Sequence, residues 1–334
     1  MIEKSAQRTA RALALVGLSL AFAASTLAQY GGGGSGGTGV VGGAAGAVVN
    51  SANSFNNNYH IGFNRPEAWG LKYFASTSLL NGLQPPEPLE GQRFGSVTLG
   101  LETDWLPSLD AGQRRIGFNG TSPEDLNKAP VLVRPVVRIG LPKKFSLILA
   151  ALPPFQVFGV TAHLFAFGVE RPILERGHWT LNWRGYGQVG SVKGAFTCPH
   201  SVLGFAQGSA DNPTECVGES ADVASLRYAG SEFQFAYRIP NMPKLVPHVA
   251  VAGNFMDLAL QVHAPVSGGL DQTRMWTRGG TFSTTAGVSY LFTKQMAFTV
   301  DVFYSPLWVQ RSAGAPTTND GLFNVRALLS YSFR

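Results

Sequence analysis

The last stretch of the chain, Phe323-Asn-Val-Arg-Ala-Leu-Leu-Ser-Tyr-Ser-Phe333, decides the fold. Its odd-numbered positions are apolar, and its even-numbered positions are polar except for Leu328. Successive side chains of a β-strand point to opposite faces of a sheet, so this period of two residues predicts a strand with one apolar and one polar face. The alternation fits a strand that faces lipid, and a soluble sandwich is the alternative.

Nine earlier segments, beginning at Arg93, show the same alternation. It is weak in 145–152 and 157–170, so the register of these two segments stays open. Twelve strands result if Leu71–Leu79 and part of 258–266 are strands as well. The ten segments are residues 93–105, 131–141, 145–152, 157–170, 179–192, 226–239, 245–257, 281–292, 295–307 and 323–333.

The links between these segments alternate in length. The short links are 142–144, 171–177, 240–244 and 293–294, and the long ones are 106–130, 193–225, 258–280 and 308–321; only 153–155 is short where a long link is expected. Bacterial outer-membrane β-barrels alternate short periplasmic turns with longer external loops. Together with the closing strand and its aromatic end, this pattern resembles that class over residues 93–333. The resemblance implies a transmembrane, antiparallel up-and-down β-barrel in residues 93–334, surrounded by outer-membrane lipid.

The composition agrees with spanning strands. The chain is 45% hydrophobic and only 14% charged, and no run of eighteen apolar residues follows Ala28. A barrel distributes its apolar residues over alternate positions, so it needs no such run.

Residues 1–28 predict a cleaved secretory signal peptide. Basic residues precede the apolar stretch Ala12–Ala24, and Thr26-Leu27-Ala28 is a cleavage site. A retained inner-membrane anchor is the alternative. Removing the segment leaves 26 − 3 = 23 basic and 20 − 1 = 19 acidic residues, a net charge of +4. No basic tract stands out, so we expect no nucleic-acid partner.

Two N-terminal elements precede the barrel. Residues 29–63 are rich in Gly and Asn and predict a flexible periplasmic lead, because small side chains cannot offset the entropy of ordering. Residues 64–82 predict an amphipathic helix over about 66–80, with Asn64 as cap, Pro66 in the first turn and Gly82 as stop. We expect this helix to plug the barrel or to pack against its periplasmic mouth.

The polar faces of the predicted strands carry charges of both signs. An unpaired buried charge is costly, so in a narrow lumen these groups must pair or remain hydrated. The two interpretations are a structural salt-bridge network and a polar path or binding site for a small solute. The candidate residues are Glu102, Asp104, Arg134, Arg138, Arg184, Glu232, Arg238, Asp301 and Arg326.

Cys198 and Cys216 lie in one polar segment and predict a disulfide that closes an external loop. We expect passive passage or binding of a small solute, or a purely structural barrel, with no cofactor or metal. The alternative is a membrane-embedded lipid hydrolase or deacylase in which a histidine activates a serine. Its only adjacent candidates, His200 and Ser201, fall in the predicted disulfide loop. The sequence leaves the oligomeric state open.

Two further features bear on the strands. Pro135 and Pro247 each remove a ladder donor, so we expect a bulge or shorter pairing at both. Aromatic residues should form rings at the two membrane boundaries. Trp179, Tyr237, Phe292, Tyr331 and Phe333 are expected at one boundary, and Trp105, Tyr304 and Trp308 at the other.

Overall fold

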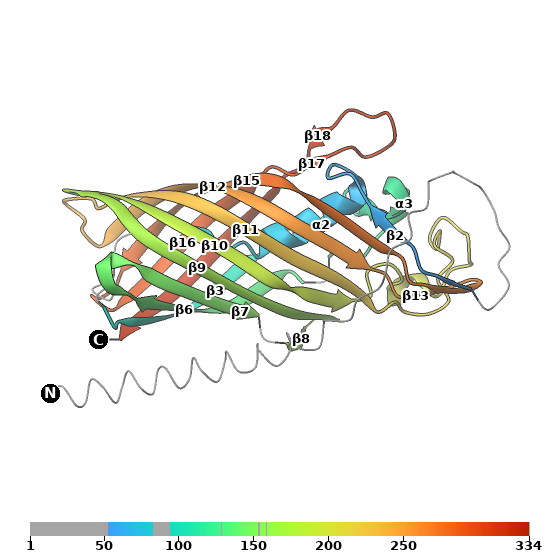
Figure 1. The fold of residues 1–334 in the computed structure, drawn as a ribbon, viewed down its shortest axis with the longest axis horizontal. Coiled ribbons are helices and arrows are strands. Elements are labelled where there is room, and N and C mark those ends of the chain that lie inside the picture. Colours follow the sequence, from blue (N-terminus) through green and yellow to red (C-terminus); the bar gives the residue numbers. More distant parts are fainter. Residues whose placement is uncertain (1–52, 83–93, 128, 153, 158, 334) are drawn as a thin grey trace.

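Ten antiparallel strands close into a β-barrel, as the sequence predicts (Figure 1). The structure is a computed structural model that describes residues 53–82, 94–127, 129–152, 154–157 and 159–333. The predicted signal peptide and residues 29–52 of the predicted lead lie outside the described residues.

Each barrel strand overlaps one of the ten predicted segments. The twelve-strand alternative is wrong, because residues 71–77 belong to helix α2 (Pro66–Thr77) and residues 258–261 extend an existing strand. The barrel strands are β3 (Val97–Trp105), β6 (Val131–Gly140), β7 (Ser146–Leu152), β9 (Val160–Arg176), β10 (Trp179–Gly194), β11 (Asp222–Tyr237), β12 (Leu245–Gln261), β15 (Arg274–Leu291), β16 (Met296–Ser305) and β19 (Leu322–Phe333).

The final strand closes the barrel against the first. Phe333 of β19 lies opposite Val97 of β3, and Val325 lies opposite Trp105. A further ladder joins β9 to β10, so every barrel strand pairs on both sides. Closure gives the backbone N–H and C=O groups of every strand hydrogen-bond partners, which hydrocarbon does not supply.

The two ends of the barrel differ, and we name them by their connections. The short-turn end carries the C-terminus and the links 141–145, 177–178, 238–244 and 292–295 (Figure 1). The long-loop end carries the links 106–130, 153–159, 195–221, 262–273 and 306–321. In outer-membrane barrels short turns are periplasmic and long loops are external.

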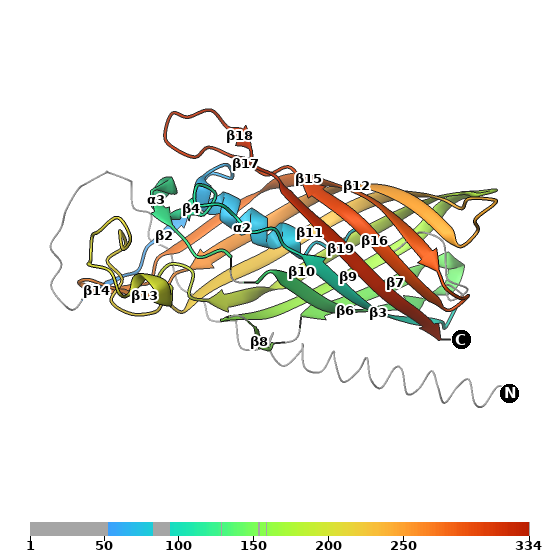
Figure 2. The ribbon, with the colours of Figure 1, turned by 180° about the vertical axis from the view of Figure 1, so that it is seen from behind.

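The barrel wall is also uneven in height. Strands β9, β10, β11, β12 and β15 have 16 to 18 residues each and form a tall wall, whereas β16, β19, β3, β6 and β7 have 7 to 12 residues. The tall wall therefore extends beyond the short one at the long-loop end (Figures 1 and 2).

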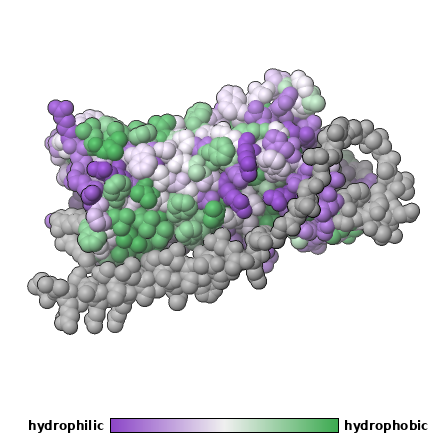
Figure 3. All heavy atoms as spheres, viewed as in Figure 1, coloured by the Kyte–Doolittle hydropathy of each residue, from purple (hydrophilic) through white to green (hydrophobic). Residues whose placement is uncertain are grey.

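Burial alternates along the strands, with apolar side chains outside. On β12, Val249, Val251 and Phe255 are more than half exposed, while Ala250 and Asn254 are buried. Apolar residues cover the part of the surface nearer the short-turn end, and hydrophilic residues gather toward the long-loop end (Figure 3). This is the exterior that a lipid bilayer requires.

Aromatic residues cluster near the short-turn end, where the sequence predicts one of the two rings. Trp179 packs on Phe235 and Tyr237, with ring centroids 4.7 and 4.1 Å away. Trp105 is exposed at the long-loop end of β3, and Trp308 is exposed in the link 306–321 that follows β16.

Both prolines remain inside strands, with shorter pairing on one side, as predicted. The β6–β7 ladder begins at Val136, one residue after Pro135. The β11–β12 ladder ends at His248, one residue before it would reach Pro247. Neither strand therefore needs the missing N–H on that side.

The N-terminal segment lies at the long-loop end and inside the barrel. Residues 53–60, expected to belong to the lead, form the short strands β1 (Asn53–Phe55) and β2 (Asn58–His60). β2 pairs with β15, and β1 pairs with the loop strand β14 (Gly269–Asp271). Helix α2 begins near these strands and runs into the lumen (Figure 2).

Helix α2 is shorter than predicted. Its N-cap is Arg65 without a side-chain cap bond, rather than Asn64, and it ends at Thr77, before Gly82. Pro66 and Glu67 in the first turn favour its start, because proline lacks an N–H that the helix would leave unbonded and a carboxylate favours the positive end of the helix dipole. In the described ranges no helix combines the length and apolarity that crossing a membrane takes.

Short elements cover the long-loop end. They are β4 (Arg115–Ile116), α3 (Gly117–Gly120), β5 (Ser122–Pro123), β8 (Gln156–Val157), β13 (Ala264–Val266), β17 (Trp308–Val309), β18 (Thr318–Asn319) and the 3-10 turn η2 (His200–Val202), while the turn η1 (Pro142–Lys144) lies at the short-turn end.

Candidate functional site

Most of the predicted interior charges occupy inward-facing positions of the barrel strands. Seven of the nine candidates are buried: Glu102, Asp104, Arg134, Arg184, Glu232, Asp301 and Arg326. Arg138 is slightly exposed, and Arg238 follows the end of β11 at the short-turn end. Alternation alone accounts for this placement, since each buried position faces inward.

Neighbouring strands bring Arg134 and Glu102 into a two-point ion pair. The two residues lie opposite each other in the β3–β6 ladder. Arg134 Nη2 lies 2.6 Å from Glu102 Oε1, and Arg134 Nε lies 3.0 Å from Oε2. The planar guanidinium matches a carboxylate in this geometry, and the pair balances two buried charges.

A second group of charges centres on Arg184. Its Nη2 lies 3.0 Å from Glu170 Oε2, and its Nη1 lies 3.2 Å from Glu232 Oε1. Glu170 also pairs with Arg138. Glu170 is absent from the sequence prediction because it ends a segment whose alternation is weak.

The third group joins Arg326, Asp104 and Asp301. Arg326 Nε lies 3.9 Å from Asp104 Oδ1. Asp301 is opposite Arg326 in the β16–β19 ladder, but its Oδ1 lies 2.8 Å from Nε2 of buried His248. His248 is not among the nine candidate residues that the sequence predicts for the interior.

These wall residues hold the N-terminal segment. We call residues 66–82 the plug segment; 11 of the 12 residues of α2 are buried, and so are the five that follow. The plug segment therefore occupies the lumen, and the barrel strands pack around it.

Backbone carbonyls at the inner end of the plug segment accept hydrogen bonds from the wall arginines. Arg134 Nη1 donates to Ser78 O at 2.7 Å, and Arg184 Nη1 donates to Gly82 O at 3.0 Å. Arg326 donates to Ser76 O, Leu79 O and Asn81 O at 3.1 to 3.2 Å. Ser76 O belongs to the last turn of α2, where carbonyls lack internal partners and carry partial negative charge, so a cation is favourable there.

Other wall groups complete the contact. The Tyr228 hydroxyl donates to Ser78 O at 2.7 Å and accepts from Leu80 N at 2.9 Å. Gln188 Nε2 donates to Ser78 Oγ at 3.0 Å, and Gly82 N donates to Glu232 Oε2 at 2.7 Å. Sequence reasoning missed these contacts because three of the four have a backbone atom as donor or acceptor, and backbone atoms carry no residue-type signal.

Toward the long-loop end the interior is apolar. Trp69, Leu71 and Tyr73 of α2 belong to one buried cluster with Leu226 and Met256 of the tall wall. The lumen is thus apolar around the helix and charged around the inner end of the plug segment. A cavity of about 10 Å³, roughly one water molecule, lies beside Gly82, Arg134 and Arg184.

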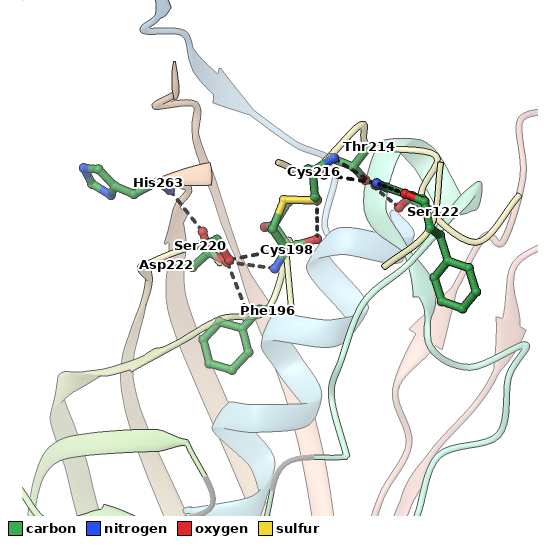
Figure 4. The surroundings of a disulfide bond; sticks show 11 residues. Ser122, Phe196, Cys198, Thr214, Cys216, Ser220, Asp222 and His263 are labelled. Atoms are coloured by element: carbon green, nitrogen blue, oxygen red, sulfur yellow. Dashed lines mark hydrogen bonds between the residues drawn. A yellow bond between two sulfur atoms is a disulfide. The ribbon is translucent and has the colours of Figure 1, made fainter. Parts of the chain in front are cut away.

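The predicted disulfide joins Cys198 and Cys216 in the loop 195–221. Near it, Asp222 Oδ2 accepts from Phe196 N, Thr197 N and Ser220 Oγ, and Asp222 Oδ1 accepts from His263 N (Figure 4). One carboxylate therefore ties together the two loops that follow β10 and β12.

The candidate hydrolase pair is not brought together. His200 is 87% exposed, and its Nδ1 lies 2.7 Å from Glu219 Oε1. Within the described residues no hydrogen bond joins His200 to Ser201. No group of three or more metal-ligating side chains occurs in the described part of the chain either.

The solved structures that this chain resembles are bacterial outer-membrane β-barrel proteins. They include the protease OmpT of Escherichia coli (11% identity, 71% of this chain and 95% of that chain, TM-score 0.36), Ail of Yersinia pestis (10%, 71% and 97%, 0.27) and the toluene transporter TodX of Pseudomonas putida (12%, 71% and 74%, 0.30). No protein-family model matches the chain, and no curated protein does. Likenesses this distant say nothing about activity.

Proposed function

We propose that this protein is an outer-membrane barrel through which a small polar solute passes when the plug segment leaves the lumen. The observation that carries the proposal is the charge balance of the wall. Arg134, Arg184 and Arg326 each face a wall carboxylate and also bind plug carbonyls. Departure of the plug segment therefore removes neutral acceptors and leaves each arginine beside its counter-charge.

Two buried side-chain amides in the lumen support the same proposal. The buried amides of Asn182 and Gln234 lie opposite each other in the β10–β11 ladder. Neither amide group forms a hydrogen bond within the described residues. Buried polar groups ordinarily have partners, so water or a hydroxyl-bearing solute suits these positions.

Conductance across a planar lipid bilayer tests the proposal. Asn81 Nδ2 donates to Ser283 Oγ at 2.7 Å, so cysteines at both positions lie close enough for a short bis-methanethiosulfonate crosslinker to join plug and wall. We expect the wild type to open intermittently, the crosslinked Asn81→Cys/Ser283→Cys variant to stay closed, and reductant to restore openings.

The wild type with reductant is the matched control, since its own disulfide lies in an external loop. A variant lacking residues 66–82 should conduct continuously. A folded deletion variant that never conducts would identify the barrel as purely structural and contradict the proposal.

A further inference from the structure

The N-terminal part of the chain takes an unexpected route through the barrel. Its first described residue, Asn53, lies at the long-loop end, where β1 pairs in parallel with β14. The chain then follows β2, which pairs in parallel with β15 from Asn58↔Arg274 to His60↔Trp276. Residues 53–60 thus belong to the same end of the molecule as the long loops.

Specific contacts hold this stretch in place. Arg274 N donates to Asn57 O at 2.7 Å, and Ile61 N donates to Trp276 O at 2.9 Å. The rings of His60 and Trp276 are 4.4 Å apart. The strand addition is therefore continuous from residue 57 to residue 61.

The next residues bind the long loops. Trp69 Nε1 donates to Asp320 O at 2.8 Å, and Lys72 Nζ donates to Trp308 O at 2.7 Å. Asn119 N donates to Glu67 Oε1 at 2.7 Å. The start of α2 is thus fixed among the loops, and its end points into the lumen.

The inner end of the route is equally defined. Gly82 lies beside Glu232 and Arg184 inside the barrel. The chain is next described at Phe94, just before β3 starts at the short-turn end. Along the chain, Asn53 therefore lies at the long-loop end, Gly82 inside the barrel and Val97 at the short-turn end.

We propose that residues 53–61, which add a strand to the long-loop end, are presented on the external face of the membrane. The proposal rests on the outer-membrane placement proposed above. An exported chain reaches the outer membrane from the periplasm, so a segment found at the external end has crossed the barrier.

Labelling of intact cells with a membrane-impermeant maleimide tests the proposal. Among the described residues the chain has no free cysteine, so a single introduced cysteine reports its own position. Asn57→Cys reports the N-terminal route, Ala313→Cys reports a long loop, and Asn241→Cys reports a short turn; all three positions are exposed.

We expect Asn57→Cys and Ala313→Cys to label equally on intact cells, and Asn241→Cys to label only after the outer membrane is permeabilised. Labelling of Ala313→Cys without Asn57→Cys overturns this inference and leaves the proposed function intact. Failure of Ala313→Cys to label on intact cells overturns the membrane orientation, and the inference with it. An epitope inserted before Asn53 should bind antibody on intact cells and provides a second readout.

Discussion

Gly82 lies where the plug segment approaches the wall most closely. Its φ is +70°, and a Cβ there would lie 2.9 Å from Asp301 Oδ2 and 2.9 Å from Thr285 Cγ2. Glycine tolerates a positive φ and adds no side chain. Both properties are needed at this position, which makes it sensitive to substitution.

We predict that Gly82→Ala weakens the barrel more than a matched glycine substitution does. Gly95 has a φ of +81°, and a Cβ added to it would meet nothing within 4 Å, so Gly95→Ala tests positive φ alone. Gly95→Ala should lower the free energy of unfolding by about 1 kcal/mol, and Gly82→Ala by roughly 1–3 kcal/mol more, through overpacking. Urea unfolding in lipid vesicles measures both free energies of unfolding. Equal losses in the two variants would contradict the close approach of Gly82 to the wall.

Glu124 lies in the long loop 106–130 and is buried without a hydrogen-bonded partner for Oε2 in the described structure. Burial, followed by repulsion from Asp222, Glu67 and Asp125, raises the pKa of Glu124 well above its usual range. A raised carboxyl pKa means that the folded loop holds its proton more tightly than the unfolded loop.

The stabilising effect of this proton is complete below the ordinary glutamate pKa and is lost as pH rises toward the raised value. We predict that hydrogen exchange in residues 112–126, corrected for its intrinsic pH dependence, becomes less protected from pH 5 to pH 9. Glu124→Gln should remove this change, because an amide does not titrate. Equal pH dependence in the variant would assign the effect to another group.

At the scale of elements, the disulfide loop supports the sheet on which β1 lies. Cys216 forms an isolated bridge with Val266 of β13, and Ser267 N donates to Glu215 O at 2.8 Å. β13 in turn pairs with β14. The crosslink therefore stabilises the surface that holds the N-terminal strand.

We predict that Cys198→Ser/Cys216→Ser loosens this loop and leaves the barrel folded. Closing a loop of this length contributes about 3 kcal/mol in the chain-entropy model. Chymotrypsin should cleave after Phe205, which is 49% exposed, faster in the variant than in the wild type. Heat-resistant migration of the barrel in gels is the control, and an unchanged cleavage rate would show that other contacts order the loop.

At the scale of the whole molecule, the apolar exterior must lie in lipid. Val251 is 57% exposed near the middle of β12, whereas Val131 is 39% exposed at the long-loop end of β6. A cation on the lipid face is most costly at the middle of the bilayer. The two valines therefore differ in the depth at which a charge would be placed.

We predict that Val251→Lys lowers the free energy of unfolding in lipid vesicles by about 2–4 kcal/mol, and Val131→Lys by about 0–1 kcal/mol. Urea titration measures both. If the exterior faced water, the two substitutions would lower the free energy of unfolding by similar small amounts. That result would contradict the placement of the barrel in a lipid bilayer.

Several predictions depended on local pattern alone, and these are confirmed. The ten strands, their order, the closing pair of β19 with β3 and the loop disulfide all follow from alternation, link length and cysteine position. The boundaries of α2 were less accurate, since a helix end depends on what surrounds it as much as on its own residues.

In the segments that alternate clearly, the sequence by itself determined which side chains face outward and which face the lumen, because a strand alternates its faces with a fixed period. Only the tertiary structure decided that Arg134, Arg184 and Arg326 bind the carbonyls of residues 76–82, and that the N-terminal segment enters from the long-loop end. Backbone acceptors are the same at every residue, so their partners are set by which segment fills the space that the strands enclose.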